Sequence, residues 1–521
     1  MDSRMRTLSR LATALLLAAQ LTACEQAPLP SADPATQLIE NVIVFDGSGV
    51  AGQKAAVRLR GNRILAVGDL ERQDSDIVID GGGRALAPGF IDTHSHADTE
   101  LFEQPGALAA VSQGITTVVV GQDGFSPFPL LDFRMKLLDH PIAVNIAAYS
   151  GHNTLREHVM KQAFRRHASD PEVAVMGQFL REDMQAGALG LATGLEYDPG
   201  IYSSTEEVIS LAKVAARQGG RYISHIRSED RWFDEAIGEI IDIGRTAGIP
   251  VQISHFKLAM TSQWGRATEV IDRLDRARAE GVDITADIYP YEYWQSNMMV
   301  LLPERDITNR DEVERALTEI APPDGLWFSQ FDPQPEYVGK TLSEVANLRE
   351  SDPVTTFMEL IALSEALQAE TGEGADMIIA TSMREQDIQQ LLAWPYSNIC
   401  TDGSLQDAHP RGAGSFPRVL GRYVREQNAL SLAEAIHKMT GLAARHMGFR
   451  DRGLIRPGMV ADLVLFDPDQ VLDRATPDQP GATSVGISRT WVNGQIVFEN
   501  GTETGRFPGR FIARQDKEDD S

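Results

Sequence analysis

The chain has little cysteine and little positive charge. Only 2 cysteines occur in 521 residues, too few for a framework of disulfides. Lysine and arginine number 48 against 74 aspartates and glutamates, so the net charge is −26. A surface of that sign repels phosphate chains, which argues against a nucleic-acid partner. With 42% hydrophobic residues, we expect the fold to be held by its own core.

The apolar run near the N-terminus is too short for a membrane span, which needs about 20 residues. It follows the basic start "MDSRMRTLSR" and ends in "LTAC" at Cys24. This pattern resembles a bacterial lipobox and implies a signal peptide at 1–23 and lipidation of Cys24. A plain secretory cleavage site is the alternative. Either way we expect export, and the lipobox implies a periplasmic lipoprotein that Cys24 anchors to the membrane in the cell envelope.

Short segments of alternating apolar residues lie near both ends of the chain. A tether rich in proline and serine, 24–36, leads into the first group at 37–86. The second group, 447–505, includes a hairpin signal at Asn493-Gly494. Because the two groups match in character, we predict one small β-sandwich domain built from both ends of the chain.

Strands alternate with helical stretches between these ends, over 87–446. Eight short apolar segments are strand candidates, which predicts an α/β fold of the (β/α)8 TIM-barrel type. The stretch 301–374 interrupts this rhythm, so we expect a mostly helical insertion beside the barrel mouth. The run "ADMIIATS" is a ninth strand candidate and could also belong to the barrel.

The segment "IDTHSHADTE" places His94 and His96 two positions apart at the end of the first strand. Residues i and i+2 of a strand point to the same side, so both imidazoles can reach one point. Other polar residues follow other strands, and in such barrels the site lies where the strands end. We therefore predict a metal site from His94, His96, Asp123, His225, His255 and Asp402.

This arrangement resembles the amidohydrolase superfamily and, within it, the N-acyl-D-amino-acid deacylases, or D-aminoacylases. The narrower resemblance rests on "QGITTVVVGQDGFS", "GALGLATGLEYDPG", "YISHIRSED", "VQISHFK", "DIYPY" and "HPRGAGSFPRVLGRYVRE". It covers nearly all of the expected mature chain. It implies a hydrolase that cleaves an N-acyl or peptide bond to a D-amino acid, with one or two zinc ions as cofactor.

Two departures from related enzymes concern the metal. Many amidohydrolases bridge two metals with a carbamylated lysine on the fourth strand, but "GALGLATG" has no lysine. D-aminoacylases commonly have a cysteine in a "GNCG"-like turn, where this chain has "GQDG" with Asp123. A carboxylate can bind and bridge zinc, and as a harder ligand than thiolate it broadens the preference towards manganese or iron.

Charge suggests roles for the six residues. His225, His255 and Asp123 are expected to hold the tighter metal, and the other three the second one. Asp402 is the expected general base, although the "TDGS" context alone favours a turn or capping aspartate before Gly403.

The substrate is expected to be a small N-acyl amino acid or short peptide. The resemblance implies that Lys257 and Tyr289 bind its α-carboxylate, with Arg411 nearby. Tyr291 is an alternative to Tyr289, and Tyr197 is expected to line the pocket. Two other functions remain open at this point: a cyclic amidase such as a hydantoinase or dihydroorotase, and a non-catalytic lipoprotein that binds ligand on the same scaffold.

Overall fold

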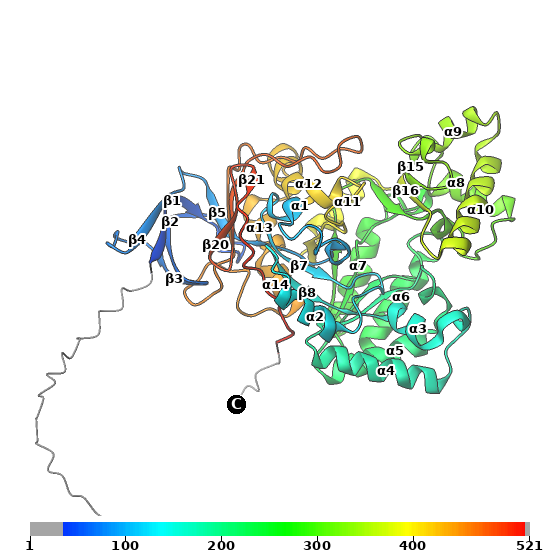
Figure 1. Cartoon of the computed structure of the whole chain (residues 1–521), viewed down its shortest axis with the longest axis horizontal. Coiled ribbons are helices and arrows are strands. Elements are labelled where there is room, and N and C mark those ends of the chain that lie inside the picture. The colour runs from blue at the N-terminus through cyan, green and yellow to red at the C-terminus, as the bar shows by residue number, and fades with distance from the viewer. Residues whose placement is uncertain (1–34, 516–521) are drawn as a thin grey trace, which may run out of the picture.

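The computed structural model describes residues 35–515. Cys24, the predicted signal peptide and nearly all of the tether lie outside this range. Figure 1 shows a β-rich part at one side, a central body of strands and helices, and a helical lobe at the far side. Within the described range, no helix combines the length and the hydropathy that a membrane span requires.

The β-rich part is one nine-stranded sheet made from both ends of the described chain. Strand β5 joins the two halves, because it pairs with β1 on one side and antiparallel with β18 on the other. The order is β21-β20-β19-β18-β5-β1-β2-β3, with β4 beside β1. The strands are β1 (Thr36–Val44), β2 (Gln53–Arg60), β3 (Arg63–Gly68), β4 (Asp76–Asp80), β5 (Ala85–Pro88), β18 (Leu463–Phe466), β19 (Ile487–Val492), β20 (Gln495–Glu499) and β21 (Thr502–Glu503).

The predicted β-sandwich domain is, in the structure, one hydrogen-bonded sheet. The single sheet curls instead, so that Arg63 on β3 forms a bridge with Val460, just before β18. Trp491, fully buried, packs in the core that this curl encloses. Strand patterns in the sequence show which segments are strands but not that β5 would pair on both edges.

The central body contains parallel strands in two hydrogen-bonded sheets. One has three strands, β6 (Phe90–Asp92), β7 (Ile115–Val120) and β8 (Asn145–Ala148). The other has six, β9 (Ser150–Gly151), β10 (Gly190–Gly194), β11 (Arg221–His225), β12 (Val251–Ile253), β13 (Ile284–Ile288) and β17 (Ser397–Ile399). Every residue of β7, β10 and β13 is buried, as expected of parallel strands covered on both faces.

The eight predicted strand segments are these strands, with β8 and β9 separated only by Tyr149. The strand pairs form two sheets and not one closed ring, so the structure shows a parallel α/β body with an additional β-domain. Backbone hydrogen bonds do link the segments that follow β6 and β17, the first and last strands of the body. The Asp402 amide donates to the His94 carbonyl at 2.9 Å, and the His96 amide donates to the Gly403 carbonyl at 2.9 Å.

Helices surround these strands, and their ends carry ordinary stop and start signals. Ser204 caps α5 by accepting from the Glu207 amide, and α6 ends at Gly248 with φ +63°. The helices of the body are α1 (Leu108–Val111), α2 (Leu130–Asp139), α3 (His152–Met160), α4 (Asp170–Gln185), α5 (Thr205–Arg217), α6 (Phe233–Ala247), α7 (Ala267–Ala279), α11 (Glu385–Ala393), α12 (Arg411–Arg418), α13 (Leu432–Met439) and α14 (Gly441–Met447).

The insertion forms the lobe at the far side in Figure 1. It contains the helices α8 (Arg310–Glu319), α9 (Leu342–Leu348) and α10 (Pro353–Thr371), and the strands β14 (Tyr293–Ser296), β15 (Leu326–Phe331) and β16 (Asp376–Thr381). The "ADMIIATS" run is β16, which pairs antiparallel with β14 and β15. This ninth candidate therefore lies outside the parallel sheets, and the lobe reaches further along the chain than 301–374.

Candidate metal centre and active site

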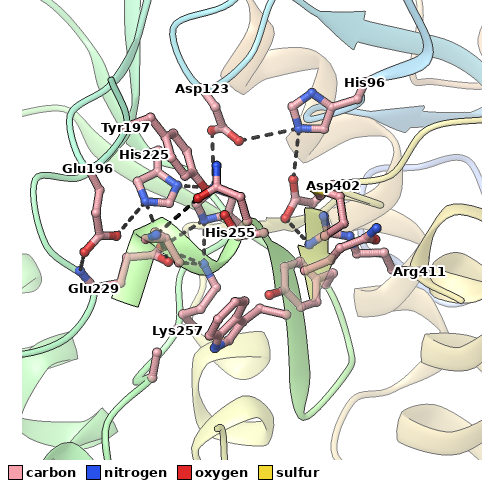
Figure 2. Close-up of a pocket in the computed structure, with 18 of the residues that line it drawn as sticks. His96, Asp123, Glu196, Tyr197, His225, Glu229, His255, Lys257, Asp402 and Arg411 are labelled. Atoms are coloured by element: carbon pink, nitrogen blue, oxygen red, sulfur yellow. Dashed lines mark hydrogen bonds and ion pairs between the residues drawn. The ribbon is translucent and has the colours of Figure 1, made fainter. Parts of the chain in front are cut away.

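The six predicted ligands lie at the carboxyl ends of five parallel strands. His94 and His96 follow β6, and His225 is the last residue of β11. Asp123, His255 and Asp402 come two or three residues after β7, β12 and β17. Figure 2 shows five of the six, all but His94, directed towards one another. The parallel arrangement thus brings residues more than 300 positions apart to one point.

Two groups of possible metal ligands share His255. In the first, the ligand atoms of His94, Asp123, His255 and Asp402 all lie within 4.8 Å of one another. In the second, those of His225, Glu229 and His255 do so. His225 Nδ1 lies 3.1 Å from His255 Nε2, which joins the two groups. Glu229 was not predicted as a candidate.

Asp123 lies between His255 and His96. Its Oδ1 lies 3.2 Å from His255 Nε2, and its Oδ2 lies 3.4 Å from His96 Nε2. Asp402 Oδ1 is 3.3 Å from both His94 Nε2 and His96 Nε2. A carboxylate with one oxygen towards each of two histidines can bridge two metal ions, as the sequence suggested for Asp123.

The donors fit zinc on two counts. Imidazole nitrogens and carboxylate oxygens are zinc ligands in proteins. In addition, both ring nitrogens of His94 are buried without a hydrogen bond among the described residues. Buried polar atoms are rarely left in this state, and a metal ion would satisfy one of them. Burial also lowers the pKa of His225 to about 4, which keeps its imidazole neutral and able to bind metal.

The backbone is strained at three of these positions. Asp123, His255 and Asp402 have φ values of +52°, +34° and +50°, in the left-handed region that residues with a β-carbon rarely adopt. Such strain costs roughly 1–3 kcal/mol per residue and concentrates at functional sites. Gly194 makes room for one of these turns, because a β-carbon there would lie 2.1 Å from the Asp123 carbonyl oxygen.

Three carboxylates that the sequence analysis missed hold the ligands in place. Glu196 Oε2 lies 2.8 Å from His225 Nε2, so the other ring nitrogen of His225 faces the cluster. Asp287 accepts from the His255 amide at 2.6 Å, and Asp92 accepts from Thr401 Oγ1 at 2.6 Å. Outer carboxylates of this kind orient metal-binding histidines. The available signal was a carboxylate at or beside a strand end, in "FID", "GLE" and "ADI".

Asp402 is also paired with a cation. Arg411 Nη1 donates to Asp402 Oδ2 at 2.5 Å. Burial would raise the pKa of Asp402, but the charges of Arg411 and of the neighbouring histidines hold it well below its usual range. Asp402 is therefore ionised at neutral pH, which is the form that a general base needs.

Lys257 is less free than the sequence suggested. Its Nζ donates to both carboxylate oxygens of Glu229 at 2.6 Å and lies 2.8 Å from His255 Nδ1. Of the two alternative tyrosines, Tyr289 lines the cavity and its buried hydroxyl has no partner among the described residues. Tyr291 donates instead to the Pro410 carbonyl at 3.3 Å and does not line the cavity.

A cavity of about 400 Å³ opens onto this cluster. Tyr197 lines it, with its ring centroid 4.4 Å from that of His225 (Figure 2). The insertion contributes the opposite wall, through residues of β14, β16 and the 3-10 turn Met298–Leu301. His152 does not line the cavity. Its side chain contacts Glu207 Oε1 at 2.9 Å and so stabilises the packing of α3 against α5.

Comparison with known proteins agrees with this site. The amidohydrolase family model matches residues 77–321 and 398–498. The N-acyl-D-glutamate deacylase of Alcaligenes xylosoxydans xylosoxydans is 38% identical over 92% of this chain and 96% of its own length. The D-aminoacylase of the same organism is 35% identical over 92% of this chain and 98% of its own length.

A solved structure extends the likeness to three dimensions. The N-acyl-D-glutamate deacylase of Bordetella bronchiseptica superposes with a TM-score of 0.81 at 34% identity, and covers 92% of this chain and 100% of its own. It was solved with zinc and a phosphonate inhibitor that mimics the tetrahedral intermediate of its reaction. The chain described here belongs to the amidohydrolase family and, within it, to the N-acyl-D-amino-acid deacylases.

Proposed function

We propose that this chain hydrolyses the amide bond of N-acyl-D-amino acids, or of short peptides that end in a D-amino acid, at a zinc centre. The observation that carries the proposal is the convergence of four imidazoles and two carboxylates at the strand ends, with both ring nitrogens of the buried His94 left without a hydrogen bond. We also infer that the two parallel sheets close into one (β/α)8 barrel, supported by the backbone bonds between the segments that follow β6 and β17.

Each group in the cavity has a role in this proposal. His225, His255 and Asp123 would hold one metal, and His94, His96 and Asp402 a second. Bound zinc would polarise the scissile carbonyl and lower the pKa of a water molecule to about 7. Asp402, kept ionised by Arg411, would take the proton of the attacking water and pass it to the leaving amine.

The other two functions have less support. Cyclic amidases of the kind considered above use a bridging lysine on the fourth strand, and β10 (Gly190–Gly194) contains none. A non-catalytic binding protein has no need to keep six metal donors converging at one set of strand ends. No residue that lines the cavity favours either function over hydrolysis of a linear N-acyl amide.

The charges that line the cavity bear on which D-amino acid it accepts. Apart from histidines, its only cations are Lys257 and Arg411, and each already faces a carboxylate, Glu229 or Asp402. Together with the unpartnered Tyr289 hydroxyl, they can bind the α-carboxylate of a substrate. The lining has no third cation for a second carboxylate.

Much of the remaining wall is apolar. It consists of Phe125, Ala259, Trp294, Val300, Leu301, Ile320 and Met377. An aspartate or glutamate side chain against this wall would be buried without a partner, at a cost of about 2–5 kcal/mol. We therefore propose that the preferred substrates have neutral side chains, although a related enzyme is named for D-glutamate.

We predict that zinc-loaded protein hydrolyses N-acetyl-D-leucine with a kcat/KM at least about 30-fold above that for N-acetyl-D-glutamate. The L-enantiomers should be far slower. Initial rates on the paired substrates measure this. Faster turnover of the D-glutamate derivative would contradict the preference, and failure on every N-acyl-D-amino acid would contradict the function itself.

Lys257→Met provides the matched control for carboxylate binding. The variant should lose about 30-fold or more on N-acetyl-D-leucine, and much less on the corresponding carboxamide, which carries no charge. Equal losses on the two substrates would mean that Lys257 supports only Glu229 and His255.

We further propose that lipidation of Cys24 anchors the protein in the cell envelope, on the periplasmic side. The support is the "LTAC" sequence after a basic and then apolar start. Cys24→Ser should move the protein from the membrane fraction to the soluble fraction, or leave it unprocessed. Unchanged processing and membrane association of the variant would count against the anchor.

A further inference from the structure

A second cavity lies on the opposite face of the molecule from the metal centre. Leu189 and Arg221, which line it, lie at the amino ends of β10 and β11, whereas the metal ligands lie at the carboxyl ends of the strands. Residues of α14 and of the segment after it, the last described residues, and Ser48, Gly219 and His437 complete the lining. Its volume is about 530 Å³, within the range of small-molecule sites.

The lining has an unusual charge for this protein. It contains six arginines and one histidine but no aspartate or glutamate, in a chain with 74 acidic residues. The six are Arg221, Arg445, Arg450, Arg452, Arg456 and Arg514. Like charges gathered in a concave surface repel one another and raise the local concentration of anions.

Three of these guanidinium groups lack an acidic partner. Arg452 pairs with Asp462 at 2.6 Å, and Arg456 lies 3.7 Å from Asp46. In contrast, Arg221, Arg445 and Arg450 form no ion pair with any carboxylate in the described part of the chain. Arg445 Nη2 lies 3.2 Å from His437 Nε2.

The neighbouring histidines add no charge to this lining. Burial, followed by the charges of Arg221 and Arg445, holds the pKa of His446 well below its usual range. Burial also lowers the pKa of His437, with a further contribution from Arg445. Both imidazoles are therefore neutral, so neither adds to the positive charge of the arginines.

We propose that this cavity, defined by Arg221, Arg445 and Arg450, is a binding site for a phosphate ester, separate from the metal centre. A guanidinium group presents paired donors that match phosphate oxygens, which makes arginine the usual residue for such anions. A cavity of this size holds a phosphate group together with the small alcohol that carries it. That group belongs either to a soluble metabolite or to a phospholipid headgroup, since both present the same chemistry.

The test measures the binding of sn-glycerol 3-phosphate to the zinc-loaded full chain by calorimetry at low salt. We expect saturable binding that Arg221→Gln/Arg450→Gln weakens at least about 30-fold, while hydrolysis of N-acetyl-D-leucine stays unchanged. Arg245→Gln is the matched control, because Arg245 is exposed and pairs with Asp242 and Glu280 elsewhere on the surface. If the double variant does not fold, Arg450→Gln alone, at an exposed position, should still weaken binding.

Two further arms separate the sources of the phosphate. Binding to phosphatidylglycerol vesicles but not to phosphatidylcholine vesicles, lost in the same variant, would identify a headgroup site; binding of glycerol 3-phosphate alone would identify a soluble ligand. No saturable binding of either probe, or binding that the arginine variants leave unchanged, would overturn the proposal. So would binding only by a chain that ends at Gln515, because the acidic residues that follow would then be the occupant.

Discussion

His255→Ala is expected to lose most of the bound zinc and at least about 10³-fold in kcat/KM. His255 is the residue that the two ligand groups share, so its removal takes a donor from both. Polarisation by a metal supplies several kcal/mol to such reactions, and about 4 kcal/mol corresponds to a factor of about 10³. Elemental analysis after gel filtration, together with initial rates on N-acetyl-D-leucine, measures both effects.

His140→Ala is the control for this change. His140 is exposed, and its ring lies near the Lys136 carbonyl and the ring of Phe102, away from the metal donors, so the same substitution should leave zinc content and activity unchanged. Thermal unfolding of the zinc-free proteins separates loss of metal from loss of fold. Full zinc retention in a folded His255→Ala variant would show that the metal assignment is wrong.

Asp402→Asn is expected to keep the fold and the zinc but to lower kcat by about 10²–10⁴-fold. That range is the usual contribution of a general base. The asparagine keeps an oxygen for His94 and His96, but it cannot accept the proton of the attacking water. Pre-steady-state or initial rates at saturating N-acetyl-D-leucine, with zinc content measured on the same sample, give the effect on kcat alone.

Asp407→Asn separates this role from the loss of a charge beside Arg411. Asp407 also lines the cavity, and its carboxylate lies 3.7 Å from Arg411 Nε, but it belongs to neither ligand group. We expect its substitution to cost less than about tenfold. Equal losses in the two variants, or near-normal turnover by zinc-loaded Asp402→Asn, would exclude Asp402 as the base.

The strand segments and the grouping of candidate metal donors could be predicted from the sequence, because both depend on local pattern. Parallel strands end at one edge, so His94, His96 and His225 could be grouped before their distances were known. The strand-face argument for the first two does not hold, because β6 ends at Asp92 and both histidines lie in the loop that follows it. The partition of the donors into two overlapping groups could not be predicted. It depends on Glu229, a carboxylate four residues beyond His225 in a loop, where acidic residues are usually solvated.

Other features depend on contacts between distant segments. Tyr289 and Tyr291 have equivalent spacing, and the structure separates them because Tyr291 reaches the Pro410 carbonyl. The β-domain is one sheet because β5 pairs on both edges. The arginine cavity combines side chains from β11, from α14 and the segment after it, and from the last described residues, and no short sequence window contains all of them.

Metal reconstitution tests the central claim most directly. Zinc should be removed with a chelator, and the resulting protein titrated with zinc while both metal content and hydrolysis of N-acetyl-D-leucine are followed. We predict no measurable activity without metal, and recovery in proportion to the first one or two zinc ions bound per chain. Full activity in the metal-free protein, or zinc binding without any hydrolysis of N-acyl-D-amino acids, would contradict the account.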